Sequence, residues 1–145
     1  RNVVAGSMAK RLGLDEGIVP ENPIFDLVLR RSDLGDPLIN DHHAVALGIM
    51  SYEEIAQMYE MSAAINRCLT ELYAKAGITV VDFKIEFGRD ANGALVLADE
   101  LSPDTCRLWD TETGERMDKD RFRRDLGRVR ETYEEVAQRL HNILK

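Results

Sequence analysis

Cysteine is scarce in this sequence, and the two that occur, Cys68 and Cys106, stand far apart along the chain. Neither belongs to a Cys-x-x-Cys pair, so the spacing indicates neither a disulfide framework nor a zinc site. His42 and His43 are adjacent and would point apart on a helix or a strand, so they cannot face one metal ion. No apolar run approaches the length that crosses a lipid bilayer. We therefore expect no membrane partner.

Positive charge is also in the minority, because 19 Lys and Arg oppose 26 Asp and Glu, which gives a formal net charge of −7. Proteins that bind nucleic acid normally present a basic surface, so we expect no nucleic-acid partner. A chain of 145 residues with 44% hydrophobic content can bury one core. We find no internal repeat or linker, and we expect residues 1–145 to form a single domain.

Two long helices are predicted. Ser51 and Glu54 form a capping box, and apolar residues then recur at three- and four-residue steps as far as Gly77. The second helix is predicted to start at its N-cap, Asp118, and to continue to Ile143 with the same periodicity.

Shorter elements complete the predicted fold. Ser7 is expected to cap a short helix that ends at Gly13, and Ile24–Leu29 is expected to form a strand. Residues 94–98 are apolar and follow the turn sequence Asp-Ala-Asn-Gly, which predicts a hairpin with the strand before it. The order of elements favours an α+β fold in which a small antiparallel sheet is flanked by the two long helices.

The first strand of that hairpin carries an unusual pattern of charge. Over residues 80–88, Asp82, Lys84 and Glu86 alternate with apolar residues and are expected to share one face, about 7 Å apart. Two carboxylates that flank an ammonium group suit a metal-bound polyphosphate. A half-buried strand with a merely solvated polar face is the alternative reading.

The register of the hairpin decides whether a further carboxylate joins this face. If the loop comprises residues 90–93, Arg89 pairs with Ala94 and Lys84 lies opposite Asp99, which places Asp99 beside Glu86. A three-residue loop with a bulge would instead move Asp99 to the apolar face.

A second charged region follows the hairpin. Arg107 comes shortly after a Ser-Pro-Asp turn and can hold a phosphate or carboxylate in a bidentate manner. A basic cluster occupies the first turns of the second helix, where the helix dipole disfavours positive charge, and consists of Lys119, Arg121, Arg123 and Arg124. An anionic ligand would explain them, and a solvated face paired with nearby aspartates is the alternative.

Several motifs, in order along the chain, resemble those of the phosphoribosylaminoimidazole-succinocarboxamide synthase (SAICAR synthetase) family. The strand motif is similar to the second signature of that family, and the start of the chain is similar to the end of the first. The matching segments are residues 1–7, 35–40, 80–88, 99–110 and 117–123.

The resemblance implies an ATP-dependent carbon-nitrogen ligase of purine biosynthesis that joins L-aspartate to carboxyaminoimidazole ribonucleotide through an acyl phosphate. ATP and Mg²⁺ are the expected cofactors, and a cytoplasmic homo-oligomer is the expected form. Members of the family begin with a β-rich lobe that covers ATP. We therefore expect this chain to be the C-terminal majority of such an enzyme, inactive when isolated from that lobe.

Roles for individual residues follow from the resemblance. It implies metal binding by Glu86 and Asp99, with Asp82 and Lys84 also at the nucleotide. Lys84 and Asp36 are the candidate catalytic residues, although an aspartate before Pro37 often serves only to nucleate a turn. The candidate substrate contacts are Arg1, Ser7, Asp104, Arg107, Lys119 and Arg123.

Two other functions remain open at this point. A related kinase-like phosphotransferase would use a similar carboxylate-lysine hairpin to phosphorylate an alcohol. A catalytically incomplete fragment could instead keep the helices as an interaction surface.

Overall fold

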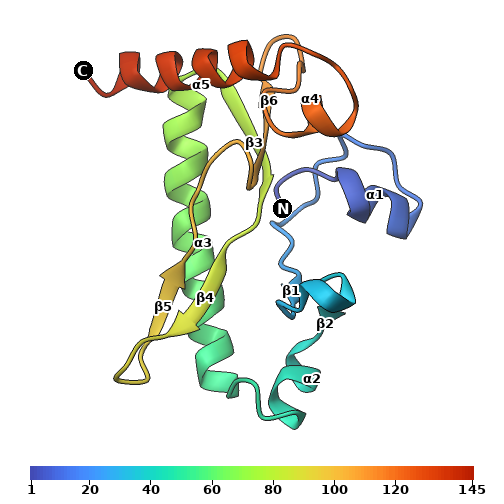
Figure 1. The fold of residues 1–145 in the computed structure, drawn as a ribbon, viewed down its shortest axis with the longest axis vertical. Coiled ribbons are helices and arrows are strands. Elements are labelled where there is room, and N and C mark those ends of the chain that lie inside the picture. Colours follow the sequence, from blue (N-terminus) through green and yellow to red (C-terminus); the bar gives the residue numbers. More distant parts are fainter.

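The longest element is helix α3 (Tyr52–Lys75), which runs down most of the computed structural model of residues 1–145 (Figure 1). Its start is capped as the sequence predicted. The Ser51 hydroxyl accepts from Glu54 N at 3.2 Å, and the Glu54 carboxylate accepts from Ser51 N at 2.8 Å. The helix ends at Lys75 with Ala76 as its C-cap. The next residue, Gly77, has a φ of 69°, a conformation that favours glycine.

The other elements are short, and every strand pair is antiparallel. The α+β prediction is confirmed, although the sheet consists of three separate two-stranded pairs. The remaining helices are α1 (Gly6–Leu12), the 3-10 helix η1 (Ser32–Leu34), α2 (Asp41–Ala46), α4 (Asp120–Arg123) and α5 (Val129–Ile143). The pairs are β1 (Leu27–Val28) with β2 (Leu38–Ile39), β3 (Ile78–Phe83) with β6 (Cys106–Asp110), and β4 (Glu86–Arg89) with β5 (Leu95–Ala98).

The main core lies where α3, α5 and the β3–β6 pair meet, near the upper end of α3 in Figure 1. Apolar side chains from all of these elements pack there because each presents one apolar face or stripe. The buried members are Tyr73, Ile78, Val80, Cys106, Leu108, Met117 and Val136.

The N-terminal segment packs against β3 at a bulge. The backbone N–H groups of Asn2 and Val3 both donate to Val81 O, at 2.8 and 3.0 Å, and the β3–β6 register shifts between Val80 and Asp82. This arrangement brings Arg1 beside Asp82, although the two are 81 positions apart. A bulge commonly re-aims a side chain in this way.

The predicted short helix and strand are present with different limits. Helix α1 ends at Gly13 as expected, but its N-cap is Ala5, because the Glu16 carboxylate accepts from Gly6 N at 2.9 Å and replaces a serine cap. The expected strand is confined to β1. Ile24 exchanges backbone hydrogen bonds with Arg1 and does not extend the ladder.

The hairpin forms, but the predicted register is wrong by one residue. Arg89 pairs with Leu95 and Glu86 with Ala98, so the loop is Asp90–Ala94. The cause is the Asp90 carboxylate, which accepts from Asn92 N and from Ala94 N, both at 2.9 Å, and so holds Ala94 in the loop. Lys84 therefore does not lie opposite Asp99.

The predicted second long helix is interrupted. Helix α4 ends at Arg123, and α5 does not begin until Val129. The segment between the two helices contains three residues with positive φ, namely Asp125, Gly127 and Arg128. The buried Arg121 side chain stabilises the break, because its guanidinium donates to the carbonyl oxygens of Gly127 at 2.8 Å and Leu126 at 3.3 Å. Those carbonyls would otherwise lack partners.

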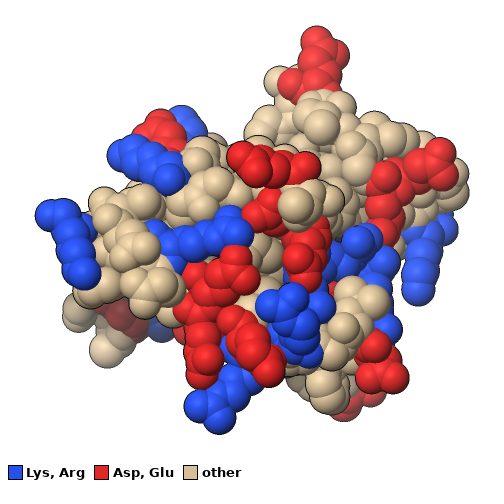
Figure 2. Space-filling model, turned by 90° about the horizontal axis from the view of Figure 1, so that it is seen from above, with Lys and Arg blue, Asp and Glu red and all other residues tan.

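Acidic and basic side chains are interleaved over the face seen in Figure 2, and neither sign forms a large separate patch there. None of the helices combines the length and the apolar character needed to cross a bilayer.

Candidate functional site

One cavity of about 770 Å³ brings together most of the residues singled out from the sequence. Its walls come from the N-terminal segment, the region around β1, helix α3, and the segment that joins β3 to β4. All of the predicted site residues except Ser7 and Lys119 line it. These are Arg1, Asp36, Asp82, Lys84, Glu86, Asp99, Asp104, Arg107 and Arg123.

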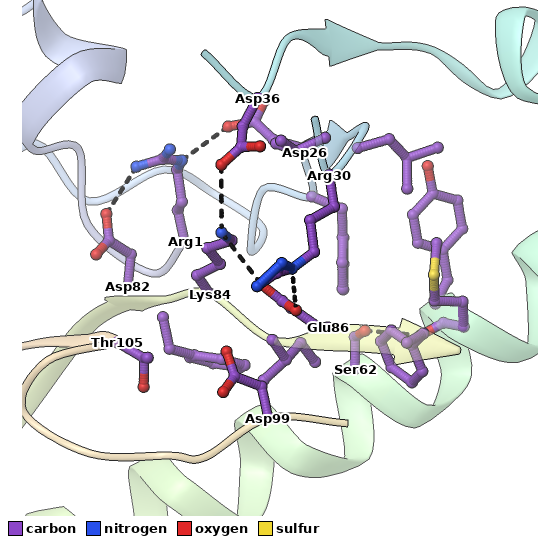
Figure 3. Close-up of a pocket in the computed structure, with 18 of the residues that line it drawn as sticks. Arg1, Asp26, Arg30, Asp36, Ser62, Asp82, Lys84, Glu86, Asp99 and Thr105 are labelled. Carbon is purple, nitrogen blue, oxygen red and sulfur yellow. Dashed lines mark hydrogen bonds and ion pairs between the residues drawn. The ribbon is translucent and has the colours of Figure 1, made fainter. Parts of the chain in front are cut away.

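Lys84 lies between two carboxylates in this cavity (Figure 3). Its Nζ is 3.3 Å from Glu86 Oε1 and 3.8 Å from Asp36 Oδ2. The Lys84 side chain is about half exposed, at 53%, so its ammonium group remains open to a ligand. An exposed ammonium held by two acidic side chains can neutralise an incoming phosphate.

Asp36 combines the two roles considered from the sequence. One carboxylate oxygen accepts from Arg31 N at 2.8 Å and closes the turn after η1, and the other faces Lys84. The turn is tight, because Asp36 itself has a φ of 50°. Aspartate tolerates this left-handed conformation better than most residues, and its backbone is thus fixed where the carboxylate can reach Lys84.

The second oxygen of Glu86 is engaged by Arg30, whose Nε lies 2.6 Å from Oε2. Arg30 could not be predicted as a site residue, since no spacing rule connects residues 56 positions apart. Arg30 is 65% exposed and Glu86 only 17% exposed, so the carboxylate is the better fixed partner of this pair.

Asp99 reaches the same cavity despite the shifted register. It follows the last residue of β5 and has a φ of 72°, which turns the chain out of the regular strand conformation. Its pKa is lowered, first by hydrogen bonding with the Glu100 side chain and backbone, then by the positive charges of Arg30 and Lys84. Glu86 and Asp99 therefore share one opening.

A line of alternating charges begins beside this cluster, and we call it the arginine–aspartate chain: Arg1, Asp82, Arg107, Asp120 and Arg123. All of its members except Asp120 line the cavity. Asp82 Oδ2 is 2.7 Å from Arg1 Nη1 and 2.9 Å from Arg107 Nη1. Asp120 lies 2.9 Å from Arg107 Nε and 2.8 Å from Arg123 Nη1. Each aspartate thus bridges two arginines that were predicted to contact substrate.

Two of these contacts were not predicted from the sequence. Asp82 pairs with the arginines, whereas the ion pairs of Lys84 are with Asp36 and Glu86. Asp120 was not among the predicted site residues, although its i,i+3 relation to Arg123 was visible in the sequence. Burial favours the neutral acid, yet hydrogen bonds from Arg123 and Arg107 lower the pKa of Asp120.

Gly6 is packed directly against the Arg107 guanidinium. A Cβ atom at Gly6 would overlap Nη2 and Cζ of Arg107, and Gly6 also has a φ of +58°. The backbone conformation therefore favours glycine, and any side chain at this position would have to displace the guanidinium. Arg107 Nη2 makes no hydrogen bond to a protein acceptor, unlike Nε and Nη1.

The remaining predicted residues lie at the margins of the site. Asp104 lines the cavity, accepts from the Tyr133 hydroxyl at 2.7 Å and is 3.7 Å from Lys119 Nζ. Burial, followed by the nearby Asp104 carboxylate, raises the pKa of Tyr133. Ser7 is exposed on α1, outside the cavity lining.

Comparison with known proteins gives a consistent result. The sequence model of the SAICAR synthetase family matches residues 1–140. The phosphoribosylaminoimidazole-succinocarboxamide synthase of Fusobacterium nucleatum is 56% identical over 140 residues, which is 97% of this chain and 59% of that protein. The Dichelobacter nodosus enzyme of the same name is 57% identical over 143 residues, 99% of this chain and 60% of that protein.

Solved structures agree. The crystal structure of phosphoribosylaminoimidazole-succinocarboxamide synthase from Ehrlichia chaffeensis has a TM-score of 0.94 and 42% identity, covering 97% of this chain and 61% of that one. A SAICAR synthetase structure in complex with ADP has a TM-score of 0.92 and 51% identity, with 97% and 60% covered. The chain thus spans about 60% of the length of the relatives it matches.

Proposed function

The chain belongs to the SAICAR synthetase family, and we propose that its cavity takes part in the ATP-dependent joining of L-aspartate to carboxyaminoimidazole ribonucleotide. The observation that carries this proposal is that two different groups of charged side chains line one cavity. Lys84 with its carboxylates forms one group, and the arginine–aspartate chain supplies the other.

The reaction needs both groups because a carboxylate is a poor acyl donor and must first be phosphorylated. In the proposed sequence, an oxygen of the ribonucleotide carboxylate attacks the γ-phosphorus of ATP, and the bond to ADP breaks. The aspartate amine then attacks the acyl carbon of the resulting acyl phosphate, inorganic phosphate leaves, and the amine loses a proton. The products are SAICAR, ADP and phosphate.

Lys84 is proposed to offset the negative charge of the phosphate that is transferred. Its half-exposed ammonium, at 53%, and its position between Asp36 and Glu86 support this role. Asp36 is proposed to hold Lys84 in place as the second catalytic residue, because its turn fixes the carboxylate 3.8 Å from Nζ.

The arginine–aspartate chain is proposed to bind the anionic ribonucleotide. Arg1, Arg107 and Arg123 bring three guanidinium groups to the cavity, and the two aspartates between them limit the mutual repulsion of those groups. The same proposal keeps Asp104 and Lys119 as further substrate contacts at the rim, and Ser7 as one outside the cavity lining.

The donor groups of the cavity fit a magnesium ion that arrives with nucleotide. Glu86 and Asp99 both line the cavity, and no group of three or more acidic, histidine or cysteine side chains is arranged to hold a metal alone. Mg²⁺ commonly uses one or two carboxylates and completes its shell with phosphate and water. Glu86 and Asp99 would hold it, and the bound ion would reduce the charge of the phosphates.

The domain organisation, cellular location and assembly of the protein follow from the same proposal. We propose that residues 1–145 form one domain, the C-terminal portion of a synthetase whose nucleotide site is completed by residues outside them. A cytoplasmic location and a homo-oligomeric assembly complete the proposal. The greater length of the matched relatives supports the proposal that residues 1–145 are only part of the synthetase.

The test is product formation by the complete protein with and without L-aspartate. Aspartate-dependent release of ADP together with SAICAR is expected. ADP release that is equally fast without aspartate would favour a phosphotransferase, and absence of any ATP turnover would favour a non-catalytic interaction role. Omission of the ribonucleotide provides the matched control.

A further inference from the structure

Asp118 is a buried carboxylate for which the proposed reaction has no use. Its side chain is fully buried, at 0% exposure, and it is not part of the cavity lining. Burial raises its pKa because the charged form loses its water, whereas hydrogen bonds from Asp120 N and Leu108 N act in the opposite direction. A buried carboxylate without a cation bonded to it calls for an explanation.

The two oxygens of Asp118 join a strand to a helix. Oδ2 accepts from Leu108 N in β6 at 2.7 Å, and Oδ1 accepts from Asp120 N, the first residue of α4, also at 2.7 Å. Met117 N donates to Leu108 O at 2.7 Å, so both polar backbone groups of Leu108 are bound by this one segment. The distance between β6 and the start of α4 is thereby fixed.

The residues joined in this way flank Arg107. Leu108 is its neighbour in β6, and Asp120 accepts from its Nε at 2.9 Å. Asp82 accepts from Nη1, and Nη2, which lies against Gly6, has no protein acceptor, so the two aspartates fix the plane of a guanidinium that lines the cavity. If the segment from Leu108 to Asp120 shifted, the orientation of the Arg107 guanidinium would change with it.

We propose that Asp118 is a positioning residue that acts through Asp120 to aim Arg107 at the anionic group of the ligand. This inference rests on the proposed function, in which Arg107 contacts the imidazole ribonucleotide. Asp118 itself does not touch the ligand. Its effect on binding must therefore depend on the presence of Arg107.

A double-mutant cycle in the complete protein tests this dependence. Asp118→Asn keeps the size of the side chain but turns an amide NH₂ toward one of the two backbone N–H groups. The affinity for carboxyaminoimidazole ribonucleotide is measured by calorimetry in the wild type, Asp118→Asn, Arg107→Ala and the double variant. We expect Asp118→Asn to weaken binding about 10-fold when Arg107 is present and less than about 2-fold when it is absent.

A second readout needs no ligand. The Arg107 Nε proton, which is hydrogen-bonded to Asp120, should exchange with solvent faster in Asp118→Asn than in the wild type when followed by ¹⁵N NMR. Val136→Ala is the matched control, because Val136 belongs to the same core as Leu108 and Met117 and its loss lowers stability. The control should alter neither this exchange rate nor the affinity.

The outcomes separate the two proposals. If the wild type does not bind the ribonucleotide, the proposed function fails. If the wild type binds the ribonucleotide and Asp118→Asn binds it equally well, the positioning role is wrong. The role is also wrong if Asp118→Asn weakens binding by the same factor with and without Arg107. Should Asp118→Asn not fold, Asp118→Glu, which keeps both acceptor oxygens but lengthens the link, is put through the same cycle and judged by the same results.

Discussion

Glu86 is the side chain on which the proposed metal site depends most. Both of its oxygens face protein cations, and it is only 17% exposed. Glu86→Gln keeps the shape but removes the charge, so we expect kcat to fall by about 100-fold and the magnesium concentration for half-maximal rate to rise. Rate measurements over a magnesium titration, with Mn²⁺ binding followed by EPR, check this.

Glu134→Gln is the matched control for that substitution, since Glu134 forms an exposed ion pair with Arg130 on α5 and neither residue lines the cavity. It should leave both measurements unchanged. An unaltered magnesium response in Glu86→Gln would contradict the metal assignment.

At the scale of residues, sequence patterns could identify the charged groups but not their partners. The alternation around Lys84 predicted one face for Asp82, Lys84 and Glu86, and all three do line the cavity. Pairing of Asp82 with Arg1 and Arg107 could not be predicted, because it depends on a bulge in β3 and on the path of the N-terminal segment. Such long-range contacts follow no local period.

At the scale of elements, capping residues were the most reliable guide. Ser51 and Gly77 correctly placed both ends of α3, because caps act on the backbone groups of a single turn. The predicted continuous helix from Asp118 was wrong, since its apolar period continues through Gly127 while the carbonyls there are bound by Arg121. Apolar periodicity alone does not reveal that a side chain such as Arg121 will bind these carbonyls in place of helical N–H groups.

The Ser51 cap gives a prediction at this scale. Ser51→Ala removes the acceptor for Glu54 N, so we expect the free energy of unfolding to fall by about 1 kcal/mol. Ser62→Ala, in the middle of the same helix, is the control, because that hydroxyl only donates to Met58 O. Urea unfolding of both variants measures the difference. Equal stability of Ser51→Ala and the wild type would contradict a stabilising cap.

At the scale of the whole molecule, Glu16 ties together three distant segments. Its carboxylate is 2.7 Å from Arg124 Nη2, 2.7 Å from Arg116 Nη2 and 2.9 Å from Gly6 N. The hydrogen bond from Arg124 is the main reason that the pKa of Glu16 falls from 4.5 to about 2. The loop after α1 is thereby held against the segment that leads to α4 and α5.

This pKa shift predicts how stability depends on pH. A depressed carboxyl pKa contributes stability that is complete above pH 4.5 and is lost as the pH falls toward 2. Glu16→Gln should therefore be less stable than the wild type by about 1–2 kcal/mol at pH 7, with the gap closing near pH 2. Urea unfolding at several pH values measures it. A difference in unfolding free energy that is independent of pH would show that the charge of Glu16 is not responsible. Glu112→Gln, in an exposed turn, serves as the control.

The contact between Gly6 and Arg107 also constrains how this protein can vary among organisms. A methyl group at position 6 would have to displace the guanidinium that Asp82 and Asp120 hold, and the positive φ of Gly6 favours glycine in its own right. We therefore expect Gly6 and Arg107, 101 residues apart in the chain, to be retained together, whereas the exposed neighbour Ser7 is free of this steric restriction.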